Sequence, residues 1–185
     1  GPQLYNGTYG HELLSSALNG VALLQGTQWD LGQDAVAFLE KVVLVGLARM
    51  SYGNWFDYNA MGWGVSRNGS HHKASAFVND IEKLLELEGP NTGELQRLRN
   101  EIAFDGNVQG TRGTGVSSFW YADFLTYQRP DFYTSVRMVS NRTEYNEKGN
   151  GEGIQHRYFG DGVNFILVNG NEYDNIPPVW NYEQL

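Results

Sequence analysis

The chain has 185 residues, 41% of them hydrophobic, which is enough for a buried core in one domain or two small ones. Its 13 basic and 21 acidic residues give a net charge of -8 without charge runs, which argues against nucleic acid and anionic membranes as general partners. No apolar run reaches the roughly 18 residues that span a bilayer, and the lack of cysteine excludes disulfides and zinc-thiolate sites. An anionic ligand would therefore need a local basic site.

Residues 1–10 are polar and rich in glycine and aromatic residues, which is typical of a loop. Apolar residues at helical spacing then predict four helices, at residues 11–25, 34–50, 74–88 and 91–101. The second is apolar nearly all round, so we expect it to be buried on several sides.

The stretch 51–73 separates the second and third predicted helices and has neither helical nor strand periodicity. It holds five aromatic residues and Arg67, and its low charge argues against disorder. Aromatic faces beside one fixed cation suit a sugar acid, so we predict a carbohydrate-binding loop. For Phe56 and Tyr58, packing beneath the loop is the alternative. The candidate substrate contacts are Trp55, Phe56, Tyr58 and Trp63.

The chain changes character after residue 105, where a glycine-rich stretch ends any helix. Strands are predicted at residues 115–124, 132–140 and 163–168 from their aromatic and β-branched content, with alternation in the second. Asn169 and Gly170 predict a hairpin turn because both residue types tolerate a positive φ. The alternating residues of the second strand are Phe132, Thr134, Val136 and Met138.

These patterns predict an α+β fold with helices first and antiparallel strands second. The expected division is a helical part at 1–105, a linker at 106–114 and a β domain at 115–185. Trp29, Trp120 and Trp180 are assigned to packing. Without a signal peptide or end signals, we expect the chain to be a segment of a longer protein.

Familiar cofactor and metal motifs are missing from the sequence. It has no GxGxxG or GxxxxGK[ST] loop, no HExxH helix and no GxSxG elbow, and the adjacent pair His71 and His72 seldom faces one metal. We therefore predict no metal and no cofactor. Sequons at Asn6, Asn68 and Asn141 would permit glycosylation in a secreted protein.

Several short motifs resemble, in order along nearly the whole chain, those of polysaccharide lyase family 8, which contains the hyaluronate, chondroitin and xanthan lyases. They are YNGTYG at 5–10, GWGVSR at 62–67, SVRM at 135–138, EKGNGE at 147–152 and GDG at 160–162. The resemblance implies an incomplete α/α toroid followed by antiparallel β-sandwich domains, with the cleft on the toroid beside the first β domain. This chain would hold the last toroid helices and the first strands, and the remaining segments of the same protein would be its partners.

The resemblance also implies β-elimination at a uronic acid, without metal or cofactor. A base removes the C5 proton, which is acidic once the adjacent carboxylate is neutralised, and the bond from C4 to the glycosidic oxygen breaks. Tyr9 matches the catalytic tyrosine of YxGxYG as base and acid. Arg67 matches the second arginine of GRxxSR, and Glu147 with Asn150 matches the E-x-x-N pair that the β domain brings to the cleft.

Two departures from the family pattern concern the site. Trp63 replaces the first arginine of GRxxSR, so one cation is lost and an aromatic platform for a sugar replaces it. The family's catalytic histidine and carboxylate-neutralising asparagine would precede Gly1, and His11 lies on the wrong side of Tyr9 to substitute for the histidine.

The expected function is that of a secreted lyase that cleaves an acidic polysaccharide such as hyaluronan, chondroitin or xanthan. One alternative is a carbohydrate-binding relative without catalysis, and another is a structural segment without a ligand site. For single residues, the alternatives are a Tyr9 wedged at a helix start, an Arg67 paired with Asp57 at the surface, an exposed loop acid at Glu147 and a turn residue at Asn150.

Overall fold

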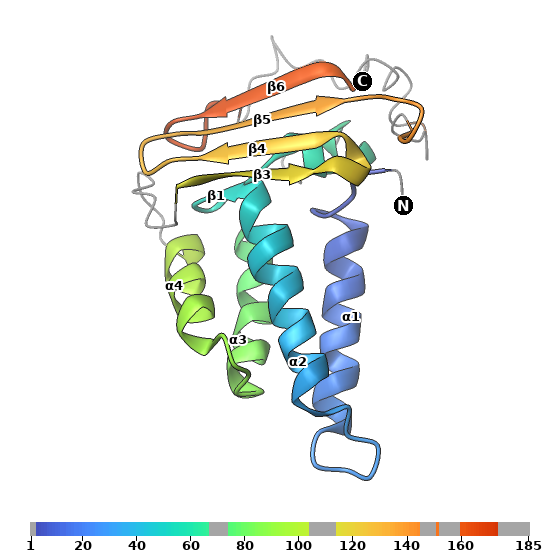
Figure 1. Ribbon diagram of the computed structural model, residues 1–185. Coiled ribbons are helices and arrows are strands. Elements are labelled where there is room, and N and C mark those ends of the chain that lie inside the picture. Colours follow the sequence, from blue (N-terminus) through green and yellow to red (C-terminus); the bar gives the residue numbers. More distant parts are fainter. Residues whose placement is uncertain (1–2, 67–73, 104–113, 145–150, 152–159, 174–185) are drawn as a thin grey trace.

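The computed structural model describes residues 3–66, 74–103, 114–144, 151 and 160–173. Helices stand side by side with one end against a four-stranded sheet (Figure 1). The predicted class, helices first and antiparallel strands second, is confirmed. The predicted linker lies almost wholly outside the described residues, so its bounds stay a prediction.

Each predicted helix corresponds to an observed one, but the second changes its winding. Its α-helical part is followed directly by a π-helical turn at Val42–Gly46 and a 3₁₀ turn at Leu47–Met50, so the single predicted helix at 34–50 has three parts. A 3₁₀ turn at Ala74–Phe77 likewise precedes the third α-helix. The α-helices are α1 (Tyr9–Leu24), α2 (Gly32–Lys41), α3 (Val78–Glu86) and α4 (Thr92–Ala103).

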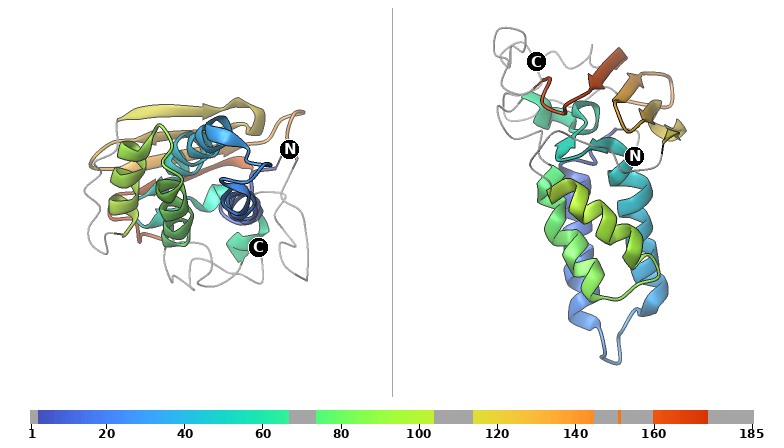
Figure 2. Two further views of the ribbon diagram at one scale, coloured as in Figure 1. Left: turned by 90° about the horizontal axis from the view of Figure 1, so that it is seen from below. Right: turned by 90° about the vertical axis from the view of Figure 1, so that its left-hand side faces the viewer.

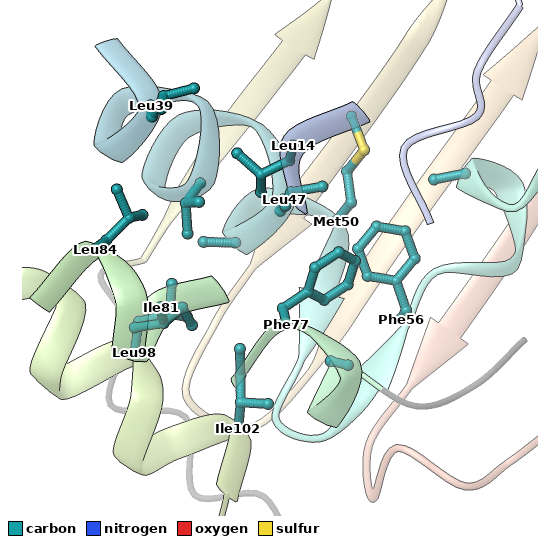
Figure 3. Packing of buried hydrophobic residues seen from close by; sticks show 14 of the residues in the cluster. Leu14, Leu39, Leu47, Met50, Phe56, Phe77, Ile81, Leu84, Leu98 and Ile102 are labelled. Atoms are coloured by element: carbon teal, nitrogen blue, oxygen red, sulfur yellow. The ribbon is translucent and has the colours of Figure 1, made fainter. Parts of the chain in front are cut away.

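The helical core is made of apolar side chains that recur every three or four residues and converge between the helices (Figure 3). The expectation that the second helix is buried on several sides is wrong for this chain. Phe38 is 65% exposed and Val45 is 54% exposed, because no described element covers that face. The core residues of the four helices include Leu14, Leu18, Leu39, Ile81, Leu84, Leu95, Leu98 and Ile102.

The sheet is antiparallel with its strands in sequence order. The strand predicted at 115–124 ends at Phe119, where a short 3₁₀ turn and Asp123, at φ 46°, reverse the chain into a strand that the sequence pattern missed. The strands are β3 (Gly115–Phe119), β4 (Phe124–Gln128), β5 (Tyr133–Met138) and β6 (Asp161–Leu167). Gly170, after β6, has φ 101°, as the predicted turn requires.

The stretch predicted as one irregular loop is regular over much of its described part. It forms a two-stranded hairpin, β1 (Ser51–Tyr52) with β2 (Trp55–Phe56), and then 3₁₀ turns at Tyr58–Ala60 and Gly62–Ser66. This teal segment lies where the helices meet the sheet (Figures 1 and 2). We call the contact region formed by residues 5–9, 57–64 and the inner face of β5 the seam. It combines buried polar side chains with apolar residues of the core such as Met61.

Two of the three tryptophans assigned to packing are on the surface of this chain. Trp29 and Trp120 are each 66% exposed, the first between α1 and α2 and the second between β3 and β4, so that assignment is wrong for both here. Trp180 lies outside the described residues. Among the described residues, no helix combines the length and apolar character needed to cross a bilayer.

Candidate active site

Tyr9 is the first residue of α1, and its side chain is 51% exposed. The backbone carbonyl of Tyr5 starts the helix, since it accepts hydrogen bonds from the amides of Thr8 at 3.2 Å and Gly10 at 2.8 Å. Thr8 makes no capping hydrogen bond with its side chain; its Oγ1 donates instead to the carbonyl of Met61 at 3.3 Å. The start of α1 is thus tied to the segment that follows β2.

Three glycines allow the two segments of the seam to touch. The amide of Gly7 donates to the carbonyl of Ala60 at 2.9 Å, and a Cβ on Gly7 would lie 2.2 Å from Sδ of Met61. Gly62 has φ 59°, and a Cβ there would lie 1.9 Å from the ring of Tyr5. A Cβ on Gly64 would approach the methyl group of Thr8 to 2.9 Å. The contact therefore requires glycine at these positions.

The close contact brings three aromatic rings into a row. The ring centroids of Tyr5 and Tyr9 are 5.3 Å apart, and those of Tyr9 and Trp63 are 6.2 Å apart with planes inclined by 36°. We call Tyr5, Tyr9 and Trp63 the aromatic row. It presents one exposed phenol, that of Tyr9, beside a partly exposed indole, and this combination suits a proton transfer next to a sugar ring.

Side chains on the inner face of β5 hold residues 57–60 in place through hydrogen bonds. The Tyr133 hydroxyl donates to Asp57, whose other carboxylate oxygen accepts from the backbone amide of Asn59 at 2.8 Å. The side-chain amide of Asn59 donates to Oγ of Ser135 at 3.0 Å. Arg137 donates from a guanidinium nitrogen to the carbonyl of Asn59 at 3.1 Å. All five residues are buried, so these bonds are directional constraints inside the protein.

Burial dominates the electrostatics of the seam. It raises the pKa of Asp57 from 3.8 to about 6, although hydrogen bonds from Ser135 and Tyr133 act in the opposite direction. Burial also lowers the pKa of Arg137 to about 10, and Tyr5 and Asp57 partly offset this fall. At neutral pH the guanidinium therefore stays charged.

Comparison with known families matches both halves of the chain. Residues 1–104 match the N-terminal α-helical domain of polysaccharide lyase family 8, and residues 114–185 match its super-sandwich domain. The chain belongs to polysaccharide lyase family 8. The resemblance inferred from the motifs is confirmed. This family 8 chain is 29% identical over 188 residues to chondroitinase-AC of Pedobacter heparinus, in an alignment that covers 100% of this chain and 26% of that protein.

Solved structures of the family have the same fold. A chondroitinase AC lyase, studied in enzyme–oligosaccharide complexes, matches with a TM-score of 0.89 and 28% identity, over 99% of this chain and 27% of that one. A xanthan lyase of Paenibacillus matches with a TM-score of 0.73 and 20% identity, over 92% and 19%. The Streptomyces coelicolor A3 chondroitin AC lyase, in complex with chondroitin sulphate, matches with a TM-score of 0.69 and 19% identity, over 90% and 28%. This chain spans about a quarter of the length of its relatives.

Of the predicted site residues of this family 8 chain, the structure brings Tyr9 and Trp63 together. Phe56 and Tyr58 are each 2% exposed, so neither offers a face to a sugar. The Tyr58 ring stacks on Phe165 at 5.3 Å, and its hydroxyl donates to the carbonyl of Tyr173. Both residues pack beneath the loop, as the alternative interpretation held. Trp55 is partly exposed and packs against a separate small cluster of Tyr52, Tyr133 and Leu167.

The other predicted site residues lie outside the described residues. These are Arg67, directly after the 3₁₀ turn Gly62–Ser66, and the pair Glu147 and Asn150. Their roles stay predictions. The alternative that pairs Arg67 with Asp57 at the surface is disfavoured, because Asp57 is buried and accepts hydrogen bonds from Tyr133 and Asn59. Among the described residues, no three side chains of metal-ligating type gather as a metal site would require.

Sequence reasoning missed the residues that build the seam. The alternation in β5 was assigned to Phe132, Thr134, Val136 and Met138, but the buried face of the strand is the opposite one. It carries Tyr133, Ser135 and Arg137. A polar inner face cannot be recognised by hydrophobic alternation. The SVRM motif at 135–138 contains Ser135 and Arg137, but it pointed to the family and not to a buried polar face.

Proposed function

We propose that the protein containing this chain is an extracellular polysaccharide lyase that cleaves a uronate-containing polysaccharide by β-elimination, with Tyr9 as general base and acid. The observation that carries the proposal is the exposed phenol of Tyr9 beside Trp63 in a chain of polysaccharide lyase family 8. Chondroitin is the first substrate to test, because the relative that is 29% identical is a chondroitinase. Hyaluronan and xanthan follow.

In the proposed reaction, the oxygen of ionised Tyr9 takes the C5 proton of the uronate. The electron pair of that C–H bond forms a double bond between C4 and C5, and the bond from C4 to the glycosidic oxygen breaks. The leaving oxygen takes the proton from Tyr9, which returns to its starting state. The step consumes no water and needs no oxidant or cofactor, and Trp63 supplies a face for the neighbouring sugar.

Three further roles rest on the family motifs alone. Arg67 would stabilise the Tyr9 phenolate or bind the substrate carboxylate, and Glu147 with Asn150 would orient these groups from the β domain. We keep these as proposals for residues outside the described part of the chain.

Replacing Tyr9 tests the reaction directly. In the full-length protein, Tyr9→Phe should lower kcat by at least about 100-fold, because the ring stays and only the proton-transferring hydroxyl is lost. The measurement is the ultraviolet absorbance of the 4,5-unsaturated uronate product. Tyr121→Phe is the matched control, since Tyr121 is an exposed tyrosine outside the aromatic row and its loss should leave kcat unchanged. Activity that survives Tyr9→Phe would exclude Tyr9 as the base.

A carbohydrate-binding relative without catalysis is the second candidate, and Trp63 in place of an arginine favours it. Such a protein would bind uronate oligosaccharides through Trp63 and Tyr9 and release no unsaturated product. Calorimetry with chondroitin oligosaccharides separates the two candidates. Binding that survives Tyr9→Phe but is lost in Trp63→Ala, without any cleavage by the wild type, identifies the binding protein.

The exposed apolar face of the helices suggests where the rest of the protein docks. A groove of about 390 Å³ lies between α1 and α2, with Leu31 and Phe38 among its lining residues. We propose that remaining segments of the same protein cover it, because apolar surface of this kind is seldom left exposed. An isolated chain that is monomeric and melts cooperatively would contradict this proposal.

Secretion and glycosylation are also proposals. The sequon at Asn6 is a poor acceptor in the fold, because Asn6 is only partly exposed and Gly7 packs tightly on Met61. Asn141 lies on an exposed turn and is the better candidate. Mass spectrometry of the protein purified from its natural source would test both sites. Unmodified Asn141 would reject the proposal that this asparagine is glycosylated.

A further inference from the structure

Arg137 is the one basic side chain that is buried among the described residues, at 3% exposure. It lies on the inner face of β5, and the register of the β5–β6 pair shifts directly after it. A buried charge is costly unless the fold uses it, and a bulge in a strand is a common way to re-aim a side chain. The position of Arg137 therefore calls for an explanation beyond packing.

Residues 59–62 are held between Arg137 and the segment that starts α1. The carbonyl of Asn59 accepts from Arg137 at 3.1 Å. The next two carbonyls, those of Ala60 and Met61, accept from the amide of Gly7 and the hydroxyl of Thr8. Gly62 then packs on the ring of Tyr5. Four consecutive residues thus transmit the position of β5 to the segment that carries Tyr9.

A second connection runs through Tyr5. Its ring packs on Gly62, the last residue of the segment that Arg137 holds, and lies 5.3 Å from the ring of Tyr9. Tyr5 also supplies the carbonyl at which α1 begins. A displacement of Tyr5 would therefore move both the ring of Tyr9 and the start of its helix.

We propose that Arg137 is a positioning residue for Tyr9, acting across the seam through Asn59 and Tyr5. The proposal rests on the proposed role of Tyr9 in the reaction. Arg137 touches no substrate; it fixes the distance between the phenol of Tyr9 and the indole of Trp63. An error of about 1 Å in such a distance is enough to cost about 100-fold in rate.

Arg49 provides a matched control. It is also an arginine that joins the helical part to the sheet, since it donates to the side-chain oxygen of Gln128 on β4 at 3.2 Å. It belongs to the 3₁₀ turn Leu47–Met50, which is not part of the seam. Arg49→Met should therefore cost stability without moving the aromatic row.

The experiment compares Arg137→Met, Arg137→Lys and Arg49→Met in the full-length protein. Arg137→Met should lower kcat on chondroitin by about 10- to 100-fold, with a smaller change in KM, at a temperature where all variants are folded. Arg137→Lys keeps the charge and one donor, so it should recover most of the loss. Arg49→Met should stay within about two-fold of the wild type.

Hydrogen exchange supplies a readout that does not depend on activity. Arg137→Met should accelerate exchange of the amides in residues 7–10 and 59–64, whereas Arg49→Met should not. Unchanged exchange in these segments, or equal losses of kcat in both variants, would overturn the proposal. A wild type without lyase activity would reject the proposed function alone, and the exchange pattern would still decide whether Arg137 holds the segment of Tyr9 in place.

Discussion

The helical core and the seam are stabilised in different ways. The core of α1 to α4 is mostly apolar, although Glu40 and Asp80 are buried there and accept hydrogen bonds from Asn91 and Ser15. The seam buries Asp57, Asn59 and Arg137 and joins them by hydrogen bonds. Apolar burial is favourable but not directional, whereas hydrogen bonds between buried groups fix position at little net gain in stability. The core therefore contributes most of the free energy of folding, whereas the seam fixes the relative positions of the segments that carry Tyr9 and Trp63.

This difference predicts which substitutions damage function and which damage only stability. A change in the core should lower the unfolding temperature and leave the activity of the folded fraction intact. A change in the seam should alter activity even where the protein stays folded. Three experiments test the contrast.

The largest effect is expected at Gly62. A Cβ there would lie 1.9 Å from the Tyr5 ring, and φ is 59°, so Gly62→Ala should cost about 4 kcal/mol in stability from overlap and backbone strain together. Displacement of Tyr5 should also lower kcat by at least about 10-fold in the folded fraction. Chemical denaturation and steady-state kinetics measure the two effects.

Gly20→Ala is the control for Gly62→Ala. Gly20 lies within α1, and a Cβ there would meet nothing within 4 Å. The substitution should stabilise the protein by about 0.5–1 kcal/mol and leave kcat unchanged, because alanine favours the helix. If Gly62→Ala were as harmless as Gly20→Ala, the tight contact between the two segments of the seam would be wrong.

The contrast between core and seam also explains what could be predicted from the sequence. Helical periodicity reports apolar burial, so the four helices and the order of helices and strands were predictable. The residues of the seam were not, because their inner positions are polar: in β5 the buried face is that of Tyr133, Ser135 and Arg137. Hydrophobic alternation marks Thr134, Val136 and Met138 instead, which lie on the less buried face.

The candidate site, like the fold, was predictable only in part. The motifs identified Tyr9 and Trp63, which the fold brings to 6.2 Å although they are distant in sequence. Phe56 and Tyr58 were separable from them only by tertiary contacts, since an aromatic residue in a loop has the same sequence signature whether it stacks on Phe165 or faces a ligand. Tyr5 and Arg137 lie within the family motifs at 5–10 and 135–138, but nothing in those motifs indicated the positioning role that we propose for Arg137.

The second experiment probes the core. Ile81 in α3 is completely buried, and Ile81→Ala should cost about 3 kcal/mol through lost apolar contacts and the cavity that remains. Ile81→Val removes one methyl group and should cost about 1 kcal/mol. Both variants should keep kcat within about two-fold of the wild type well below their melting temperatures. A kcat loss that exceeds that of Gly62→Ala would break the distinction between core and seam.

The third experiment uses the charge buried in the seam. The pKa of Asp57 is raised from 3.8 to about 6 by burial, so the native state binds a proton that the unfolded chain releases between these values. The stability that Asp57 contributes is therefore full below about pH 4 and is lost as pH rises through about 6. Relative to Asp57→Asn, the wild type should gain about 2–3 kcal/mol when the pH falls from about 7 to about 4.

Asp30 gives the control of opposite sign for this titration. Backbone hydrogen bonds from Gly26 and Gly32 lower the pKa of its exposed carboxyl group, so its contribution is present at neutral pH and is lost as pH falls. Wild type and Asp30→Asn should therefore diverge in the direction opposite to that seen for Asp57→Asn. Equal pH dependence of the wild type and Asp57→Asn would mean that folding does not raise the pKa of Asp57, so its carboxylate would be as ionised at neutral pH in the folded protein as in the unfolded chain. The hydrogen bonds from Tyr133 and Asn59, together with the charge of Arg137, would then offset the cost of burying Asp57 in full.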